Sequence, residues 1–169
     1  MKTLTKILLL VVLFAGLTSL AIAETDTTQS TVTITFSEIA QIAASGNPGT
    51  LTIVVPTTPG DLPADQSDAS TTMAWTSNVA AGQTRKITGS LASLFDGIDL
   101  YATVTAAGGG TSEGALKFTA AATDYNFVTG IGNCNTSGET ITFRASVTAM
   151  VAPYTSAKVV TWTLTEDAL

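Results

Sequence analysis

The 169-residue chain has 13 acidic and seven basic side chains, one cysteine and no histidine. Charged residues make up 12% of it, about half of the ~25% usual in globular domains, while hydrophobic residues make up 45%. Lack of histidine excludes histidine-based catalytic triads, histidine-ligated zinc and haem ligation by histidine, and a single cysteine excludes a disulfide within one chain. We therefore expect a protein that is not an enzyme and has no cofactor.

The first 23 residues are typical of a cleaved signal peptide. Lys2 and Lys6 give a positive start, Ile7–Leu20 is almost continuously apolar, and Ala21–Ala23 forms an A-x-A cleavage site. The apolar run of 14 residues is shorter than the ~20 that a membrane-spanning helix needs. These features predict export, a secreted or cell-surface location, and no membrane span after processing.

The remaining 146 residues are enough for one domain with its own core. They carry 13 acidic and five basic side chains, a net charge of −8. Such a surface repels phosphate backbones and anionic lipid headgroups. We expect no nucleic-acid partner.

The processed chain begins with a polar, threonine-rich leader at residues 24–30. The next residues, Thr31–Phe36, alternate between Val32, Ile34 and Phe36 on one face and threonines on the other. This period of two with β-branched residues predicts a strand.

Ser37–Ala44 carries Ile39 and Ile42 three positions apart among several alanines, a spacing that favours a short helical turn. Beyond Leu51 the chain consists of short β-rich runs separated by turn residues, and Thr57–Ser70 is the longest loop. The expected strands there are Leu51–Val55, Thr71–Thr76, Thr84–Leu91, Asp99–Ala106, Ala115–Thr119, Tyr125–Thr129, Thr140–Met150 and Lys158–Thr165.

Evenly spaced short strands without long helices predict an all-β fold. We expect an antiparallel β-sandwich of eight or nine strands, immunoglobulin-like or jelly-roll, as a single domain over residues 31–169. Trp75 and Trp162 lie in expected strands and are assigned to the core.

Two loops gather carboxylates. Asp61, Asp65 and Asp68 share one loop and are candidate calcium ligands, although their spacing matches no calcium-loop pattern and a solvated acidic loop is the alternative. Asp96 and Asp99 flank a turn, where a glycosidase-type carboxylate pair competes with an ordinary turn.

Cys134 lies in the turn-rich stretch 130–138. Without histidine or another nearby base, a catalytic thiolate is not expected. An odd cysteine in an exported chain predicts a free thiol or an intermolecular disulfide.

The order of an A-x-A signal, a polar leader, an alternating apolar strand and a Thr/Gly/Ala-rich remainder ending in Val159–Thr165 resembles bacterial secreted pilin-like and spore-coat-U-like fibre subunits. In such proteins the N-terminal strand of one subunit completes the sandwich of the next. The resemblance implies that role for Thr31–Phe36. The chain departs from many such pilins in its lone Cys134 and in its Asp167–Leu169 end, which puts assembly by a dedicated chaperone and usher in doubt.

The resulting hypothesis is a secreted structural protein that self-assembles into a homo-oligomer, with Val32, Ile34 and Phe36 filling apolar slots in a neighbour. The alternative is a monomeric module that binds a surface glycan through exposed aromatics, such as Trp75 and Tyr101 with Tyr125 or Tyr154. A hydrolase based on the acidic loops is the third reading.

Overall fold

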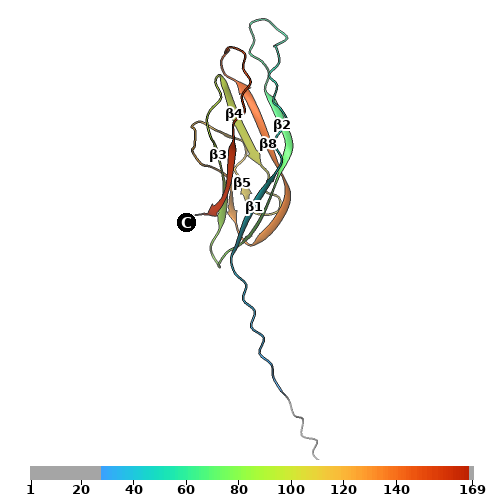
Figure 1. Ribbon diagram of the computed structural model, residues 1–169, viewed down its shortest axis with the longest axis vertical. Coiled ribbons are helices and arrows are strands. Elements are labelled where there is room, and N and C mark those ends of the chain that lie inside the picture. Colours follow the sequence, from blue (N-terminus) through green and yellow to red (C-terminus); the bar gives the residue numbers. More distant parts are fainter. Residues whose placement is uncertain (1–27, 168–169) are drawn as a thin grey trace, which may run out of the picture. The chain divides into compact units, whose positions relative to one another are not determined.

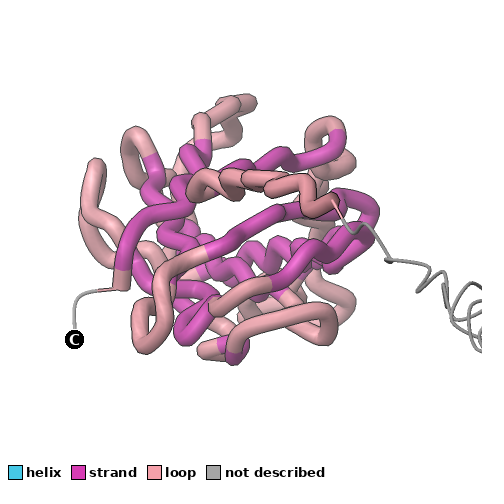
Figure 2. Tube along the Cα trace, turned by 90° about the horizontal axis from the view of Figure 1, so that it is seen from below, coloured by secondary structure: helices cyan, strands magenta, loops and turns pink. Residues whose placement is uncertain are grey.

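The computed structural model describes residues 28–167, and the signal peptide expected at residues 1–23 lies outside them. The chain divides into two units, Met1–Thr35 and Phe36–Leu169. The described part of the first unit contains no strand. The second holds nine strands, and the described chain is strand and loop only, as Figure 2 shows.

The strands form two antiparallel sheets, so the expected all-β antiparallel sandwich is confirmed (Figure 1). Sheet A has the order β1-β2-β8-β4-β6, and sheet B has the order β5-β7-β3-β9. The strand bounds are β1 Ile39–Ser45, β2 Gln66–Asn78, β3 Arg85–Leu91, β4 Ile98–Val104, β5 Thr111–Ser112, β6 Leu116–Lys117, β7 Tyr125–Ile131, β8 Cys134–Val147 and β9 Val160–Glu166.

The core lies between the sheets because the inner face of each central strand is apolar and its outer face is polar. In β8, Ile141 and Phe143 are at most 5% exposed, whereas the intervening Thr142 and the following Arg144 are partly exposed. This alternation is the pattern of a sheet with one wet face. The buried cluster consists of Met73, Trp75, Ile87, Leu91, Leu100, Ala102, Val104, Phe118, Phe127, Val128, Ile131, Ile141 and Phe143.

The N-terminal expectations are wrong in three places. Thr31–Phe36 and Leu51–Val55 belong to no strand, while the segment expected as a helical turn forms β1. Pairing decides these cases: β1 forms an unbroken antiparallel register with β2, from Ile39 opposite Asn78 to Ser45 opposite Thr72. The alanines of this segment favour a helix, but pairing with β2 outweighs that local preference. The tendency of a segment to form a strand depends on the neighbouring strands available to it.

Smaller differences lie at the strand ends. β2 begins at Gln66, inside the expected loop 57–70, and β8 begins at Cys134, inside the expected turn-rich stretch. The two-residue strand β5 follows the triple glycine and was not expected from the sequence.

Gly89 in β3 leaves room for an aromatic side chain from the neighbouring strand. A Cβ built on it would lie 2.6 Å from Cζ3 of Trp162 and 2.8 Å from Cε2 of Phe127. These two rings form an edge-to-face pair with centroids 5.0 Å apart. The missing side chain therefore lets Trp162 cover the core from β9.

We expect Gly89→Ala to lower the free energy of unfolding by about 1–3 kcal/mol, the usual cost of overpacking a core. Gly132→Ala is the matched control, because a Cβ there meets nothing within 4 Å. Urea unfolding measures both. Equal stability of the two variants would contradict this account of Gly89.

Candidate functional site

The segment Thr31–Phe36 leaves its apolar face in water. Val32, Ile34 and Phe36 are 80%, 85% and 78% exposed, and no strand pairing is recorded for this part of the described chain. Three large side chains at alternate positions form one apolar row in extended backbone. A row of this kind, without a partner, is a candidate interaction surface.

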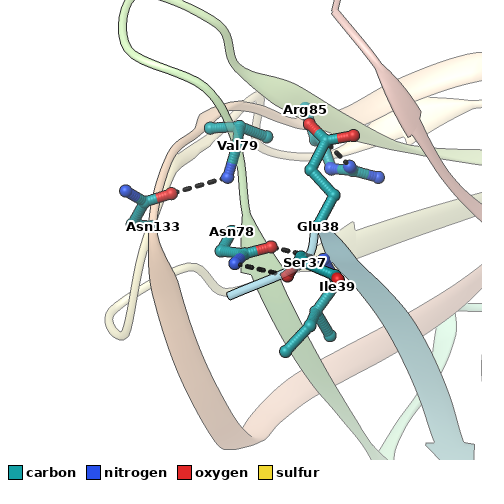
Figure 3. Close-up of polar contacts among 7 residues, drawn as sticks. All are labelled: Ser37, Glu38, Ile39, Asn78, Val79, Arg85 and Asn133. Atoms are coloured by element: carbon teal, nitrogen blue, oxygen red, sulfur yellow. Dashed lines mark hydrogen bonds and ion pairs between the residues drawn. The ribbon is translucent and has the colours of Figure 1, made fainter. Parts of the chain in front are cut away.

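Polar contacts fix the point at which this segment joins the sandwich (Figure 3). The Asn78 side chain, at the end of β2, accepts a hydrogen bond from the backbone N–H of Ile39 and donates one to the carbonyl of Ser37 at 3.0 Å. Beside it, Asn133 accepts a hydrogen bond from the N–H of Val79 at 2.6 Å. The two asparagines thus hold the start of β1 and the end of β2.

An ion pair adds to this anchor. Arg85 of β3 is 7% exposed, and its guanidinium lies 3.6 Å from the carboxylate of Glu38, immediately before β1 (Figure 3). A nearly buried charge is costly unless it is paired. Glu38 therefore ties the entry of β1 in sheet A to β3 in sheet B.

The second element of the site is the free edge of β9. Within residues 28–167, β9 pairs with β3 alone, in a continuous register from Arg85 opposite Glu166 to Leu91 opposite Val160. Its core-facing residues Val160, Trp162 and Leu164 pack against the buried cluster but remain partly exposed.

This edge lacks the usual protection against pairing. β9 contains no proline and one charge, Glu166 at its C-terminal end, and its register with β3 has no bulge. Charges, prolines and bulges are the common devices that block edge-to-edge association. The edge of β9 is therefore open to an added strand.

The candidate calcium ligands have separate partners. Asp65 pairs with Arg144 of β8, and hydrogen bonds from Ser146 and Arg144 lower the pKa of Asp65. Asp68 accepts hydrogen bonds from the backbone and hydroxyl of Ser70, at 3.0 and 2.6 Å. No three carboxylate or thiol side chains in residues 28–167 are grouped so as to hold a metal ion, and Asp61 is simply exposed.

Asp96 and Asp99 also have different surroundings. Asp96 lines an open surface pocket of about 390 Å³ between the loops near residues 94–96 and 151–158, and its carbonyl accepts a hydrogen bond from Tyr154 at 2.8 Å. Asp99 pairs with Lys117 at 2.5 Å, and this hydrogen bond raises the pKa of Lys117. Neither arrangement links the two carboxylates to each other.

The aromatic platform suggested by the sequence does not form. Trp75 is 2% exposed and belongs to the core, as its place in an expected strand predicted. Tyr101 lies on the outer face of β4 with the Arg144 guanidinium 3.9 Å above its ring. The Tyr125 hydroxyl is bound at 2.9 Å by the backbone N–H groups of Thr119 and Ala120.

Cys134 is a free, partly buried thiol at the first position of β8. It packs against the core cluster and lies so close to Gly109 that a Cβ there would be 2.7 Å from its Sγ. The thiol therefore fills space beneath the glycine loop.

Sequence reasoning missed a buried carboxylate in β8. Glu139 is 5% exposed and accepts hydrogen bonds from the Thr105 hydroxyl at 2.5 Å, the Gly108 N–H at 2.7 Å and the Thr136 hydroxyl at 3.1 Å. Burial raises the pKa of Glu139, but these hydrogen bonds, with one from Ala107, outweigh that effect and lower it. Glu139 fixes the glycine loop to the sandwich.

No protein-family model matches the chain, and no curated protein or solved structure matches it either. The described residues contain no helix that is long and apolar enough to cross a membrane.

Proposed function

We propose that this protein is an exported structural subunit that assembles with copies of itself by β-strand addition. The observation that carries the proposal is the exposed apolar row of Val32, Ile34 and Phe36 in a chain that also has an open sheet edge. An extended segment that joins such an edge forms main-chain hydrogen bonds and places alternate side chains in apolar slots. The secreted location rests on the signal-like residues 1–23.

Burial of the row supplies the driving force. Each of the three side chains contributes about 1.5–3 kcal/mol when it leaves water completely. The total of roughly 5–9 kcal/mol is reduced by the cost of ordering a segment that has no strand partner in the single chain. Backbone hydrogen bonds along the shared edge add to the remainder.

The anchor at the start of β1 suits this role. Ser37 and Ile39 are held by Asn78, and Glu38 is held by Arg85, so tension on the segment is transmitted to both sheets. A donated strand would then connect two folded sandwiches through the short segment Ser37–Ile39, which is held in place by these contacts. This geometry favours a linear assembly of folded subunits.

The test compares three forms of the processed chain: residues 24–169, residues 31–169 and residues 37–169. We expect the first two to form filaments or large oligomers, and the third to remain monomeric, by size-exclusion chromatography and electron microscopy. The middle form is the control, because it lacks the polar leader and keeps the apolar row. Assembly of residues 37–169 to the same extent as the longer forms would contradict the proposal, and a dispersed 24–169 chain would favour the monomeric binding module.

A further inference from the structure

The triple glycine lies in a loop that passes from one sheet to the other. This glycine loop, residues 105–110, follows β4 of sheet A and leads to β5 of sheet B. A Cβ on its first two glycines would lie 1.8 Å from Oγ1 of Thr136 and 2.7 Å from Sγ of Cys134, both in β8. A Cβ on its third glycine would lie 2.7 Å from Cγ1 of Val128 in β7. The loop therefore lies directly on β8 and then on β7, with no room for side chains between.

Three side chains of β8 face the interior beneath this loop. Glu139, Thr136 and Cys134 lie opposite three residues of β2 that are each at most 2% exposed, namely Met73, Trp75 and Ser77. Residues directly opposite each other in neighbouring strands share a face of the sheet. The glycine loop thus covers a carboxylate and a thiol that both point inward.

Glu139 is the point at which the loop is attached. Its Oε2 accepts the Thr105 hydroxyl at 2.5 Å, and its Oε1 accepts the Gly108 N–H at 2.7 Å and the Thr136 hydroxyl at 3.1 Å. The Ala107 N–H donates to the same carboxylate. In the described chain, the hydrogen bonds from the backbone of residues 106–110 to the strands both end on it. Three consecutive glycines regain much conformational freedom on release, so this carboxylate holds the loop closed against a large entropy.

A neutral carboxyl group cannot hold the loop in the same way. An ionised carboxylate only accepts hydrogen bonds, which suits a site where every partner donates. A proton on Oε1 would turn an O–H donor toward the Gly108 N–H, which is itself only a donor. Hydrogen bonds to an ionised acceptor are also about twice as strong as neutral ones. Protonation therefore weakens every contact that closes the loop.

No other charge takes the place of Glu139 in the part of the chain that the structure describes. Loop residues 105–110 are uncharged, and so are the residues of β2 opposite the carboxylate and the thiol. The charged side chains of β3 and of the residue after β5 have other partners, in the pairs Arg85 with Glu38, Lys86 with Asp167, and Glu113 with the Thr129 hydroxyl. The other titratable group beneath the loop is the thiol of Cys134.

We propose that the glycine loop is an acid-released cover, which the ionised carboxylate of Glu139 holds closed over Cys134 and which opens when that carboxylate takes up a proton. The opened loop exposes the thiol and one side of Val128 and Ile131, both fully buried in the closed form, while the rest of the sandwich stays folded. The inference is independent of strand donation, because none of these groups belongs to the N-terminal segment.

The direction of the pH effect follows from the closed structure. Burial raises the pKa of Glu139, but its hydrogen bonds outweigh burial and hold the pKa below the ordinary value of 4.5. Opening the loop removes those bonds and returns the pKa toward the ordinary value. A group with the lower pKa in the closed form favours that form when it is ionised. Opening therefore increases as the pH falls through 4.5 and levels off below the lower pKa of the closed form.

Hydrogen exchange and thiol labelling test the cover on the processed chain, residues 24–169. Mass spectrometry follows the amides of residues 106–110 from about pH 7 to about pH 3, corrected for intrinsic exchange, with β3 as the internal reference. In parallel, 4,4′-dithiodipyridine labels Cys134, and each rate is divided by that of the urea-unfolded chain at the same pH. Glu139→Gln is compared with Glu113→Gln, the matched control, whose exposed carboxylate accepts a single hydrogen bond.

At pH 7 we expect Cys134 to be labelled about tenfold faster in Glu139→Gln than in the unchanged chain, because charge-assisted hydrogen bonds are lost. Glu113→Gln should match the unchanged chain. Below about pH 4.5 the unchanged chain should approach the rate of Glu139→Gln, whose own normalised rate should vary little with pH. The loop amides should exchange at least about tenfold faster than those of β3, as expected for local opening.

Equal protection of the loop and of β3 at every pH would show that only global unfolding exposes the loop, and would overturn the proposal. Equal labelling of the unchanged chain and Glu139→Gln at both ends of the pH range would overturn it as well. If Glu139→Gln does not fold, Thr136→Val removes one hydrogen bond to the same carboxylate and keeps the side-chain shape. Labelling about threefold faster at pH 7 would then support the proposal, and an unchanged rate would contradict it.

Discussion

Replacing Ile34 with aspartate is expected to abolish assembly while leaving the sandwich folded. Ile34 is 85% exposed in the single chain, so its replacement removes no intramolecular packing. In an assembled neighbour the carboxylate would be buried without a partner, in place of a side chain whose burial contributes about 1.5–3 kcal/mol. Removing that contribution and burying an unpaired charge, at several kcal/mol, should weaken association at least about 1,000-fold.

Thr33→Asp is the matched control because it adds the same charge to the opposite face of the same segment. We expect it to assemble at close to the level of the unchanged chain, since its side chain stays in water. Analytical ultracentrifugation gives the association constants, and circular dichroism checks the fold. Equal loss of assembly in both variants would point to general charge repulsion rather than burial of one face.

Replacing Glu139 with alanine is expected to lower the free energy of unfolding by about 3 kcal/mol, within the range for removing hydrogen bonds to a buried charged group. The change leaves the Thr105 hydroxyl and the Gly108 N–H without their acceptor. Glu113→Ala is the control, because Glu113 is an exposed carboxylate that accepts a single hydrogen bond, from Thr129 at 2.6 Å. Urea unfolding measures the difference, and a loss no larger than that of Glu113→Ala would contradict the role given to Glu139.

The same residue predicts a pH dependence. The pKa of Glu139 is lower in the folded chain than the ordinary glutamate value of 4.5. Its carboxylate therefore contributes fully to stability above the unfolded-state pKa, and that contribution is lost as the pH falls through the lower, folded-state pKa. From about pH 5 downward we expect the unchanged chain to lose stability more steeply than Glu139→Ala. Parallel curves for the two proteins would contradict the assignment.

The sequence predicted the central strands well because each carries an alternation strong enough to place one face on a core. Ile141 and Phe143 alternate with polar residues, and the structure buries both. The same rule overpredicted at Thr31–Phe36 and Leu51–Val55, which alternate or are β-rich but pair with no strand in the described chain. Alternation shows that a segment can form a strand, but a strand also needs a neighbouring edge.

Only one part of the candidate site could be predicted from the sequence. The apolar row of Val32, Ile34 and Phe36 follows directly from the spacing. The anchor formed by Asn78 and Arg85 was not foreseen, because these residues come from β2 and β3 and contact residues 41 and 47 positions earlier in the chain. The burial of Glu139 could not be predicted either, since a lone acidic residue in a polar stretch is normally exposed to solvent.

What the sequence determined by itself is chemical: an acidic composition without histidine, an all-β pattern, and one segment in which apolar residues alternate with threonines. What only the tertiary structure decided is which edges remain open. Sheet order places β9 at the border of sheet B, where Val160, Trp162 and Leu164 remain partly exposed. The physical reason is that side-chain period is a local property, whereas an edge is defined by strands distant in the chain that either do or do not supply its hydrogen bonds.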